Sequence, residues 1–272
     1  MAKLAISNIA WTGHNEQVFD LLAKLGVSGV EVAPGKVANG WDDLSVLKIR
    51  AYREQCANFG LSIPSFQAFL FGKPHFQLLG GEDVFEAMLE HVSFVAELAA
   101  EAGAGVLVYG APKSRLLLGY GLAEAEALAI ERLKKLAAVC ASHGVSIGLE
   151  AVPSAYAGEF ITSFTDSLRI VKAVNSPGLV LHLDTGCTWL NGDNVSLAIE
   201  QTSDLIRHFH ISQPQLLDFS EPAPYHIEAA KALRERGYSH WCCIEMLESK
   251  SPLAAIEQAV NYVKSVYAIS PD

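Results

Sequence analysis

A short apolar run followed by a longer amphipathic segment repeats along the whole chain, and this alternation limits the folds that the chain can adopt. Eight apolar runs, none longer than nine residues, lie at residues 4–11, 29–34, 61–69, 105–112, 145–153, 179–186, 206–212 and 241–247. Nearly continuous apolar runs of this length are typical of strands that are buried on both faces of a parallel sheet. The pattern therefore predicts eight buried strands separated by helices.

The intervening segments have the period of amphipathic helices. In residues 82–103, Val84, Met88, Val92 and Val95 recur at steps of three or four residues, which places them on one helical face. Glycines that precede the next strand are expected to close several of these helices in the left-handed conformation: Gly26, Gly60, Gly103, Gly144, Gly178 and Gly237.

Eight strand-helix units in 272 residues give 34 residues per unit. No linker, low-complexity tract or change of composition divides the chain, so residues 1–272 are expected to form one domain. This pattern predicts an α/β fold, a single-domain (β/α)8 TIM barrel with eight strands and eight helices. A doubly wound open sheet is disfavoured because no glycine-rich nucleotide-binding motif follows any strand.

Charge and composition exclude several classes of protein. The 20 basic and 30 acidic residues give a net charge of −10, which argues against general nucleic-acid binding. No run is long enough to cross a membrane, and the N-terminal residues do not have the pattern of a signal peptide. The five cysteines are an odd number without C-x-x-C spacing, so we expect reduced thiols and a cytoplasmic location.

Four residues of the types that bind metals end four consecutive predicted strands. Glu150, Asp184, His210 and Glu245 are separated by 34, 26 and 35 residues, about one strand-helix unit each. Side chains at the C-terminal strand ends of such a barrel face one mouth, where catalytic groups lie. Each residue taken singly is better explained as an isolated polar group at a strand end, but the four in register favour one divalent ion. Hard oxygen ligands favour Mn²⁺ or Mg²⁺, although Zn²⁺ or Co²⁺ also bind such sites.

The order of these four residues, with the phrases GVEVAP, FQAFLFG, YGAPKSR, GLEAVP, LHLDTG, HFHIS and IEM, resembles the xylose isomerase-like barrel superfamily. The resemblance covers the whole chain and is strongest to the sugar phosphate isomerase/epimerase branch, which includes the ketose 3-epimerases. It implies a divalent metal held by Glu150, Asp184, His210 and Glu245. It also implies that Glu150 and Glu245 are catalytic and transfer protons.

The chain departs from the epimerase pattern at two places. Cys187 stands where the family has a histidine three residues after the strand-six aspartate. Gln213 stands where the family tends to have a glutamate, and Leu216 stands where an arginine is found shortly beyond it. The family groups at these places help to hold substrate, so Cys187 and Gln213 are candidate substrate-binding positions.

Further polar candidates come from strand alternation and from a basic loop. Glu31 should point into the barrel, either to accept a substrate hydroxyl or as half of a buried ion pair. His182 and His208 should lie one layer deeper than Asp184 and His210, as core histidines or as groups that orient the ligands. Lys113 and Arg115 follow the fourth strand and either neutralise a substrate anion or form a solvated loop. Four aromatic residues near strand ends could pack against a sugar ring: Trp11, Phe69, Tyr156 and Trp189.

These features predict a divalent-metal-dependent isomerase or epimerase of a small sugar, keto-sugar or sugar phosphate. The expected partner is a small carbohydrate substrate, with no nucleic acid and no membrane, and the prediction leaves room for a homo-oligomer. A dehydratase of the inositol type on the same metal site and a non-catalytic sugar-binding barrel are the alternatives. The zinc endonuclease of this superfamily is disfavoured because its additional histidines have no counterparts in this chain.

Overall fold

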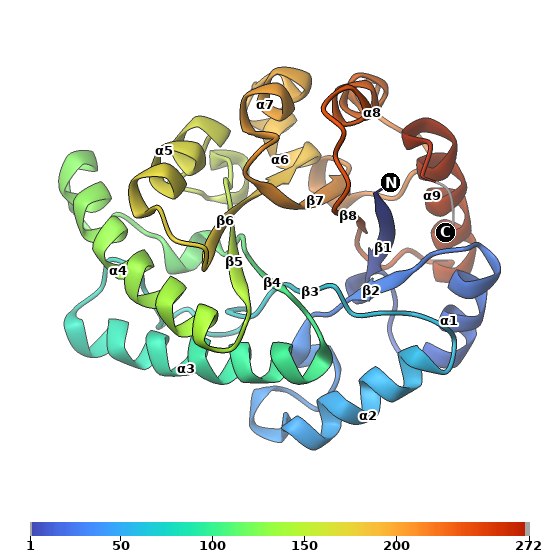
Figure 1. The fold of residues 1–272 in the computed structure, drawn as a ribbon, viewed down its shortest axis with the longest axis horizontal. Coiled ribbons are helices and arrows are strands. Elements are labelled where there is room, and N and C mark those ends of the chain that lie inside the picture. The colour runs from blue at the N-terminus through green and yellow to red at the C-terminus, as the bar shows by residue number, and fades with distance from the viewer. Residues whose placement is uncertain (1, 270–272) are drawn as a thin grey trace.

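The computed structural model describes residues 2–269 and contains eight parallel strands arranged as a barrel (Figure 1). Each strand coincides with one of the eight predicted runs, with β1 beginning one residue before its run, so the predicted strands and the (β/α)8 fold are confirmed. The strands are β1 Lys3–Ser7, β2 Gly29–Glu31, β3 Ser65–Phe66, β4 Val106–Tyr109, β5 Ser146–Glu150, β6 Leu179–Asp184, β7 Ile206–Ser212 and β8 Trp241–Glu245.

The hydrogen-bonded order of the strands is β2-β1-β8-β7-β6-β5-β4-β3. The barrel closes between β2 and β3 through two isolated bridges, Gly29 with Ser62 and Val32 with Phe66. β3 is only two residues long, and Pro64 directly before it has no N–H group to donate to a neighbouring strand. The seam between β2 and β3 is therefore more weakly paired than the seams that join β5 to β8.

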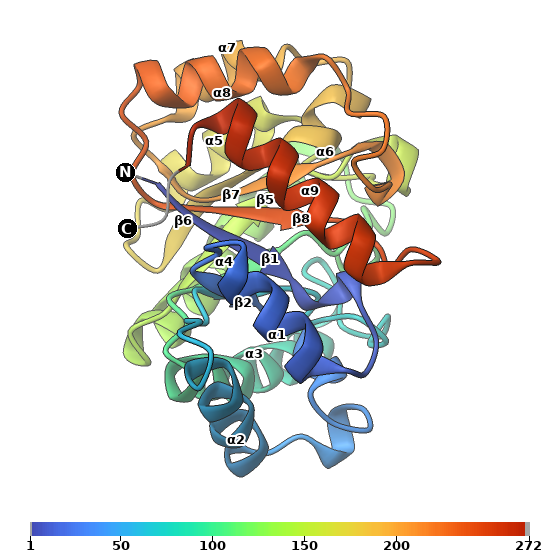
Figure 2. The same cartoon turned by 90° about the vertical axis from the view of Figure 1, so that its right-hand side faces the viewer.

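Nine α-helices lie outside the strands in the described part of the chain (Figures 1 and 2). They are α1 Asn15–Lys24, α2 Val46–Ala57, α3 Glu82–Ala102, α4 Leu122–Ser142, α5 Phe164–Val174, α6 Thr185–Leu190, α7 Val195–Thr202, α8 Tyr225–Glu235 and α9 Pro252–Tyr267. Short 3-10 helices occupy the loops: η1 Asn8–Ala10, η2 Pro34–Lys36, η3 Trp41–Asp43, η4 Pro112–Ser114, η5 Ser154–Tyr156 and η6 Pro214–Leu216. No helix within residues 2–269 is long and apolar enough to cross a membrane.

The expected number of eight helices was wrong because two helices connect β6 to β7. Asp184 caps α6 directly at the end of β6, by accepting a hydrogen bond from the Cys187 backbone N–H. Gly192, with a φ of 81°, then turns the chain, and Asn194 caps the separate helix α7. A helix that starts at the strand end places Asp184 and Cys187 side by side in the barrel mouth.

Five of the six predicted helix-closing glycines have left-handed backbone conformations. The prediction was wrong for Gly178, because α5 is closed by Asn175 with a φ of 49°. Gly178 is required for a different reason, since a Cβ atom there would lie 2.1 Å from the carbonyl oxygen of Ala137 on α4. Close packing of the loop against α4 therefore explains this glycine.

Candidate active site

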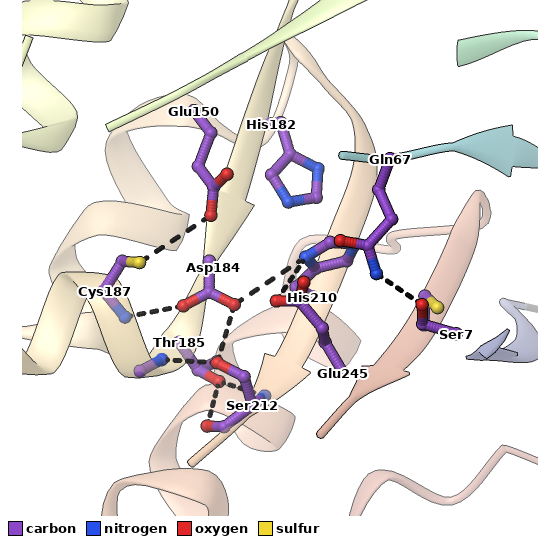
Figure 3. Close-up of polar contacts among 12 residues, drawn as sticks. Ser7, Gln67, Glu150, His182, Asp184, Thr185, Cys187, His210, Ser212 and Glu245 are labelled. Carbon is purple, nitrogen blue, oxygen red and sulfur yellow. Dashed lines mark hydrogen bonds and ion pairs between the residues drawn. The ribbon is translucent and has the colours of Figure 1, made fainter. Parts of the chain in front are cut away.

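The four predicted ligands meet at the C-terminal ends of β5, β6, β7 and β8 (Figure 3). Ligand atoms of Glu150, Asp184 and His210 lie within 4.8 Å of one another. The Nδ1 atom of His210 lies 3.1 Å from Glu245 Oε2 and 3.8 Å from Asp184 Oδ2. All four side chains are buried or nearly so, and they form one cluster of three carboxylates and one imidazole.

Asp184 is held by groups from both neighbouring segments. Its Oδ1 atom accepts a hydrogen bond of 2.6 Å from the Cys187 backbone, as the cap of α6. Its Oδ2 atom accepts a hydrogen bond of 2.6 Å from the Ser212 hydroxyl at the end of β7. Because both oxygens are fixed in this way, the carboxylate has little freedom to turn away from His210.

Glu150 depends on a glycine and an arginine that follow β4. A Cβ atom at Gly110 would lie 1.7 Å from Glu150 Oε2, so this glycine leaves the space that the carboxylate occupies. Arg115 donates a hydrogen bond of 2.8 Å to the backbone carbonyl of Glu150. The Cys187 thiol lies 3.7 Å from Glu150 Oε1 and donates to it. These three contacts define where the carboxylate lies.

His210 is oriented by Glu31 on β2. The Nε2 atom of His210 lies 2.9 and 3.1 Å from the two oxygens of Glu31, on the side opposite the three carboxylates. A carboxylate that accepts a hydrogen bond from one ring nitrogen leaves the other nitrogen free to act as a metal ligand. The prediction that Glu31 points into the barrel is confirmed, and its partner is a buried histidine.

The two deeper histidines extend this network below the mouth. Ser65 donates a hydrogen bond of 2.7 Å to Glu31, and its oxygen lies 2.8 Å from Nε2 of His208. The Nδ1 atoms of His208 and His182 are 3.3 Å apart. Burial lowers the pKa of both imidazoles, to about 4 for His208, so they are neutral at pH 7. The network therefore links β2, β3, β6 and β7 in the layer beneath the cluster.

The electrostatics of the cluster show an excess of negative charge. Burial, together with Asp184 and Glu245, raises the pKa of Glu150 to about 8. Burial likewise raises the pKa of Glu245. Burial opposes a charge on His210, but Glu31 and Glu245 outweigh it and raise the pKa of this imidazole well above its usual range. In the absence of a cation, the carboxyl groups of Glu150 and Glu245 therefore keep their protons to a higher pH than exposed carboxyl groups do.

A divalent cation fits this arrangement. The Nδ1 atom of His210 is buried and makes no well-formed hydrogen bond, although it faces the carboxylates of Asp184 and Glu245. A cation near this atom would satisfy it and would neutralise carboxylates that burial makes costly. Three carboxylates with one imidazole form a hard ligand set, which suits Mn²⁺ or Mg²⁺.

A cavity of about 710 Å³ lies directly above the cluster. Glu150 and Glu245 line its inner end, and the loops after β3, β4, β5, β7 and β8 form its walls. Four of the predicted substrate-binding residues contribute to its surface: Phe69, Lys113, Tyr156 and Cys187. Burial raises the pKa of the Cys187 thiol well above its usual range, so this group is a neutral hydrogen-bond donor.

Five other candidates are absent from the residues, within 2–269, that line this cavity: Trp11, Glu31, Arg115, Trp189 and Gln213. Trp189 is half exposed and packs on Tyr225. Trp11 packs edge-on against Phe19, and its indole N–H bonds to Asn15. Glu31 is fully buried and engaged with His210. The side chain of Gln213 bonds to the backbone of Glu221 and Ala223 and so holds the loop after β7.

Arg115 differs most from the solvated or substrate-binding basic group that the sequence suggested. Its guanidinium is fully buried, 5.1 Å from the centre of the Tyr109 ring. The chain turns inward directly after η4, which carries Arg115 beneath the site while Lys113 remains exposed. Its positive charge lowers the pKa of Glu150, against the larger opposite effect of burial.

Several residues of the site were missed in the sequence. Ser212 ends a predicted strand two residues after His210, so strand alternation was an available signal. Gln67 follows β3 and lines the cavity, and its amide donates to the Ser7 hydroxyl. Gly110 carries no local pattern that separates it from other loop residues, because its role depends on its contact with Glu150 on another strand.

Residues 19–266 match the xylose isomerase-like TIM barrel family, and the chain belongs to this family. Among curated relatives, it is 21% identical to fructoselysine 3-epimerase of Escherichia coli O157:H7 over 238 residues, which are 85% of each protein. Among solved structures, it is similar to 3-keto-D-glucoside 4-epimerase from E. coli, with a TM-score of 0.79, 17% identity and coverage of 97% of this chain and 100% of the other. It is also similar to D-psicose 3-epimerase from Clostridium cellulolyticum H10, with a TM-score of 0.81, 14% identity and coverage of 97% and 99%.

Proposed function

We propose that this protein is a divalent-metal-dependent sugar epimerase or isomerase that moves a proton at a carbon beside the carbonyl of a keto-sugar. The observation that carries this proposal is the convergence of Glu150 and Glu245 on Asp184 and His210 at the inner end of the cavity. Relatives that are named as epimerases of fructoselysine, of a 3-keto-D-glucoside and of D-psicose support the same reaction class.

The proposed metal ligands are Glu150, Asp184, His210 and Glu245, with Mn²⁺ or Mg²⁺ as the preferred ion. When bound, such an ion polarises the substrate carbonyl and lowers the barrier to removal of the adjacent proton. Asp184 is fixed by Cys187 and Ser212 and serves as a ligand alone. Glu150 and Glu245 also line the cavity, so their carboxylates are the groups that exchange protons with the substrate.

The positions of the two glutamates favour epimerisation. They end β5 and β8, on either side of β6 and β7, so a substrate between them has one carboxylate toward each face. An epimerase needs this arrangement because the proton leaves one face of the carbon and another proton arrives at the opposite face. An aldose-ketose isomerase can work from a single face.

Deuterium exchange tests the proposal. A keto-sugar that is incubated with the Mn²⁺-loaded protein in D₂O should gain deuterium at the carbon beside its carbonyl, measured by NMR and mass spectrometry. Glu150→Gln and Glu245→Gln should each abolish exchange, while Glu257→Gln on the exposed face of α9 serves as the matched control. Elemental analysis should find about one ion per chain, and Asp184→Ala should lose it.

The same experiment separates the alternatives. A product that has lost water would identify a dehydratase. If the metal-loaded protein exchanges no deuterium with a broad panel of ketoses, keto-sugars and sugar acids, the proposal is refuted in favour of a non-catalytic sugar-binding barrel.

A further inference from the structure

The cavity above the cluster has two chemically different parts. Its inner end presents the polar groups of Glu150, Cys187 and Glu245. The rest of its lining is mainly apolar and runs from buried to exposed side chains of the loops after β3 and β8 and of η6: Phe69, Leu70, Leu216, Leu247 and Phe71. A ligand that fills the cavity therefore meets carboxylates at one end and a mainly apolar lining along the rest.

The size of the cavity exceeds what a single sugar needs. A volume of about 710 Å³ lies within the range that holds drug-sized ligands, well above a monosaccharide. A keto-sugar whose carbonyl lies between the two glutamates occupies the inner end and leaves the outer part unfilled. The outer part is therefore large enough for a second chemical group on the same molecule.

The outer wall is unsuited to sugar hydroxyls. A hydroxyl that is moved from water to an apolar surface loses its hydrogen bonds to water and gains none in return, which is unfavourable. Phe71 and Leu247 are 80% and 53% exposed. A bound ligand that extends outward from the cavity would therefore cover apolar surface that now faces water. The loop that carries Phe71 is anchored, because the indole N–H of Trp41 donates a hydrogen bond of 3.0 Å to the Phe71 carbonyl. This surface therefore suits methylene or aromatic groups.

Two lysines line the same cavity in a chain of net charge −10. The Lys73 ammonium lies 5.6 Å from the ring centres of Trp41 and Phe76. Lys113 is exposed, and within residues 2–269 neither ammonium group forms an ion pair with an acidic side chain. Two cations without an acidic partner on the wall of a mainly apolar space favour an anionic group on the ligand.

We infer that the substrate is a keto-sugar conjugate, with an apolar substituent along Phe69, Phe71, Leu216 and Leu247 and an anionic end at Lys73 and Lys113. This inference rests on the proposed function and specifies its substrate class. The sugar end supplies the reacting carbon to the glutamates. The substituent supplies binding free energy from surface that takes no part in proton transfer.

A series of synthetic ligands tests the inference. It comprises D-fructose and D-tagatose, the same sugars with a hexyl group on carbon 1 or on carbon 6, and the hexyl conjugates with a terminal carboxylate. Deuterium exchange gives kcat/KM, and calorimetry gives Kd, for each compound on the Mn²⁺-loaded protein. For one attachment position, kcat/KM should rise at least about thirtyfold with the hexyl group. It should rise about tenfold further with the carboxylate.

Variants locate the effect in the cavity wall. Phe71→Ala with Leu247→Ala should remove most of the gain from the hexyl group, whereas Leu47→Ala, at an exposed leucine of α2, should leave that gain intact. Lys73→Ala with Lys113→Ala should bring the ratio between the carboxylated and the plain hexyl conjugate close to 1. Lys172→Ala, at an exposed lysine of α5, should not change the ratio.

The outcomes separate this inference from the proposed function. If deuterium exchange is as fast with the free ketoses as with every conjugate, the inferred substrate class is refuted and the proposed reaction stands. If no compound exchanges but the carboxylated conjugates bind more tightly than the free sugars, the reaction is refuted and the binding preference stands. Absence of both exchange and binding overturns both.

Discussion

Replacement of Glu31 by glutamine should weaken metal binding without disturbing the fold. The carboxylate is fully buried and lies 2.9 Å from Nε2 of His210 and 2.7 Å from the Ser65 hydroxyl. Glutamine has nearly the same volume, so its carbonyl can still accept from His210 while its amide donates to the Ser65 oxygen. The variant therefore keeps an acceptor against His210, reverses the direction of the bond to Ser65 and loses the negative charge.

The loss of that charge determines how much metal affinity the variant loses. A charged acceptor strengthens a hydrogen bond about twofold over a neutral one and makes the imidazole a better ligand. Removal of such a partner typically costs about 10-fold to 100-fold in metal affinity. This range corresponds to about 1.4 to 2.8 kcal/mol. The pKa of His210 should also fall, because Glu31 raises it in the parent protein.

Calorimetric titration of the metal-free protein with Mn²⁺ at pH 8 measures the effect directly, and circular dichroism checks the fold. Ser65→Ala is the matched control, because it removes one bond to Glu31 and leaves the carboxylate against His210. The control should lose about threefold or less. Equal affinities of the parent and Glu31→Gln, or an equally large loss in Ser65→Ala, would refute the role assigned to this carboxylate.

Three further predictions follow from the site. Gly110→Ala should lower Mn²⁺ affinity more than about tenfold, because its Cβ would lie 1.7 Å from Glu150 Oε2; Gly121→Ala, which meets no atom within 4 Å, should not. Between pH 6.5 and 8 the metal-free protein should lose stability by up to ~1.4 kcal/mol per pH unit for each group, because folded Glu150 and His210 hold protons that the unfolded chain releases. Urea denaturation in EDTA measures the free energy of unfolding at each pH, and a value that stays constant or rises between pH 6.5 and 8 would contradict the prediction. Iodoacetamide should modify Cys187 slowly at pH 8, because its pKa is raised; rapid modification seen by mass spectrometry would show an activated thiolate instead.

The strands and the ligand cluster were predictable because both depend on local sequence. A buried strand must be apolar along its length, and a barrel strand presents its functional group at its C-terminal end. Glu150, Asp184, His210 and Glu245 satisfy both conditions at intervals of about one strand-helix unit. Parallel strands in register then bring these four residues together, independently of the conformation of the loops between the strands.

The cavity wall was only partly predictable because loop conformation decides it. Lys113 and Arg115 are two residues apart in one basic loop, yet one is exposed and the other is fully buried. Trp11 follows β1 in the same way that Phe69 follows β3, but Trp11 packs into the core against Phe19. Such differences come from turns and contacts with distant segments, and neither composition nor periodicity encodes them.

The weak seam between β2 and β3 divides the barrel into parts that can change independently. The four strands that carry the proposed ligands, β5 to β8, are joined by ladders of at least four residue pairs each, whereas β3 is two residues long and meets β2 through isolated bridges. The loop that carries Phe69, Phe71 and Lys73 leaves the barrel from β3. We therefore expect insertions or substitutions in this loop to reshape the cavity entrance with little strain on the proposed metal ligands. For protein engineering, the region after β3 is the place to alter ligand preference without disturbing the carboxylate-histidine cluster.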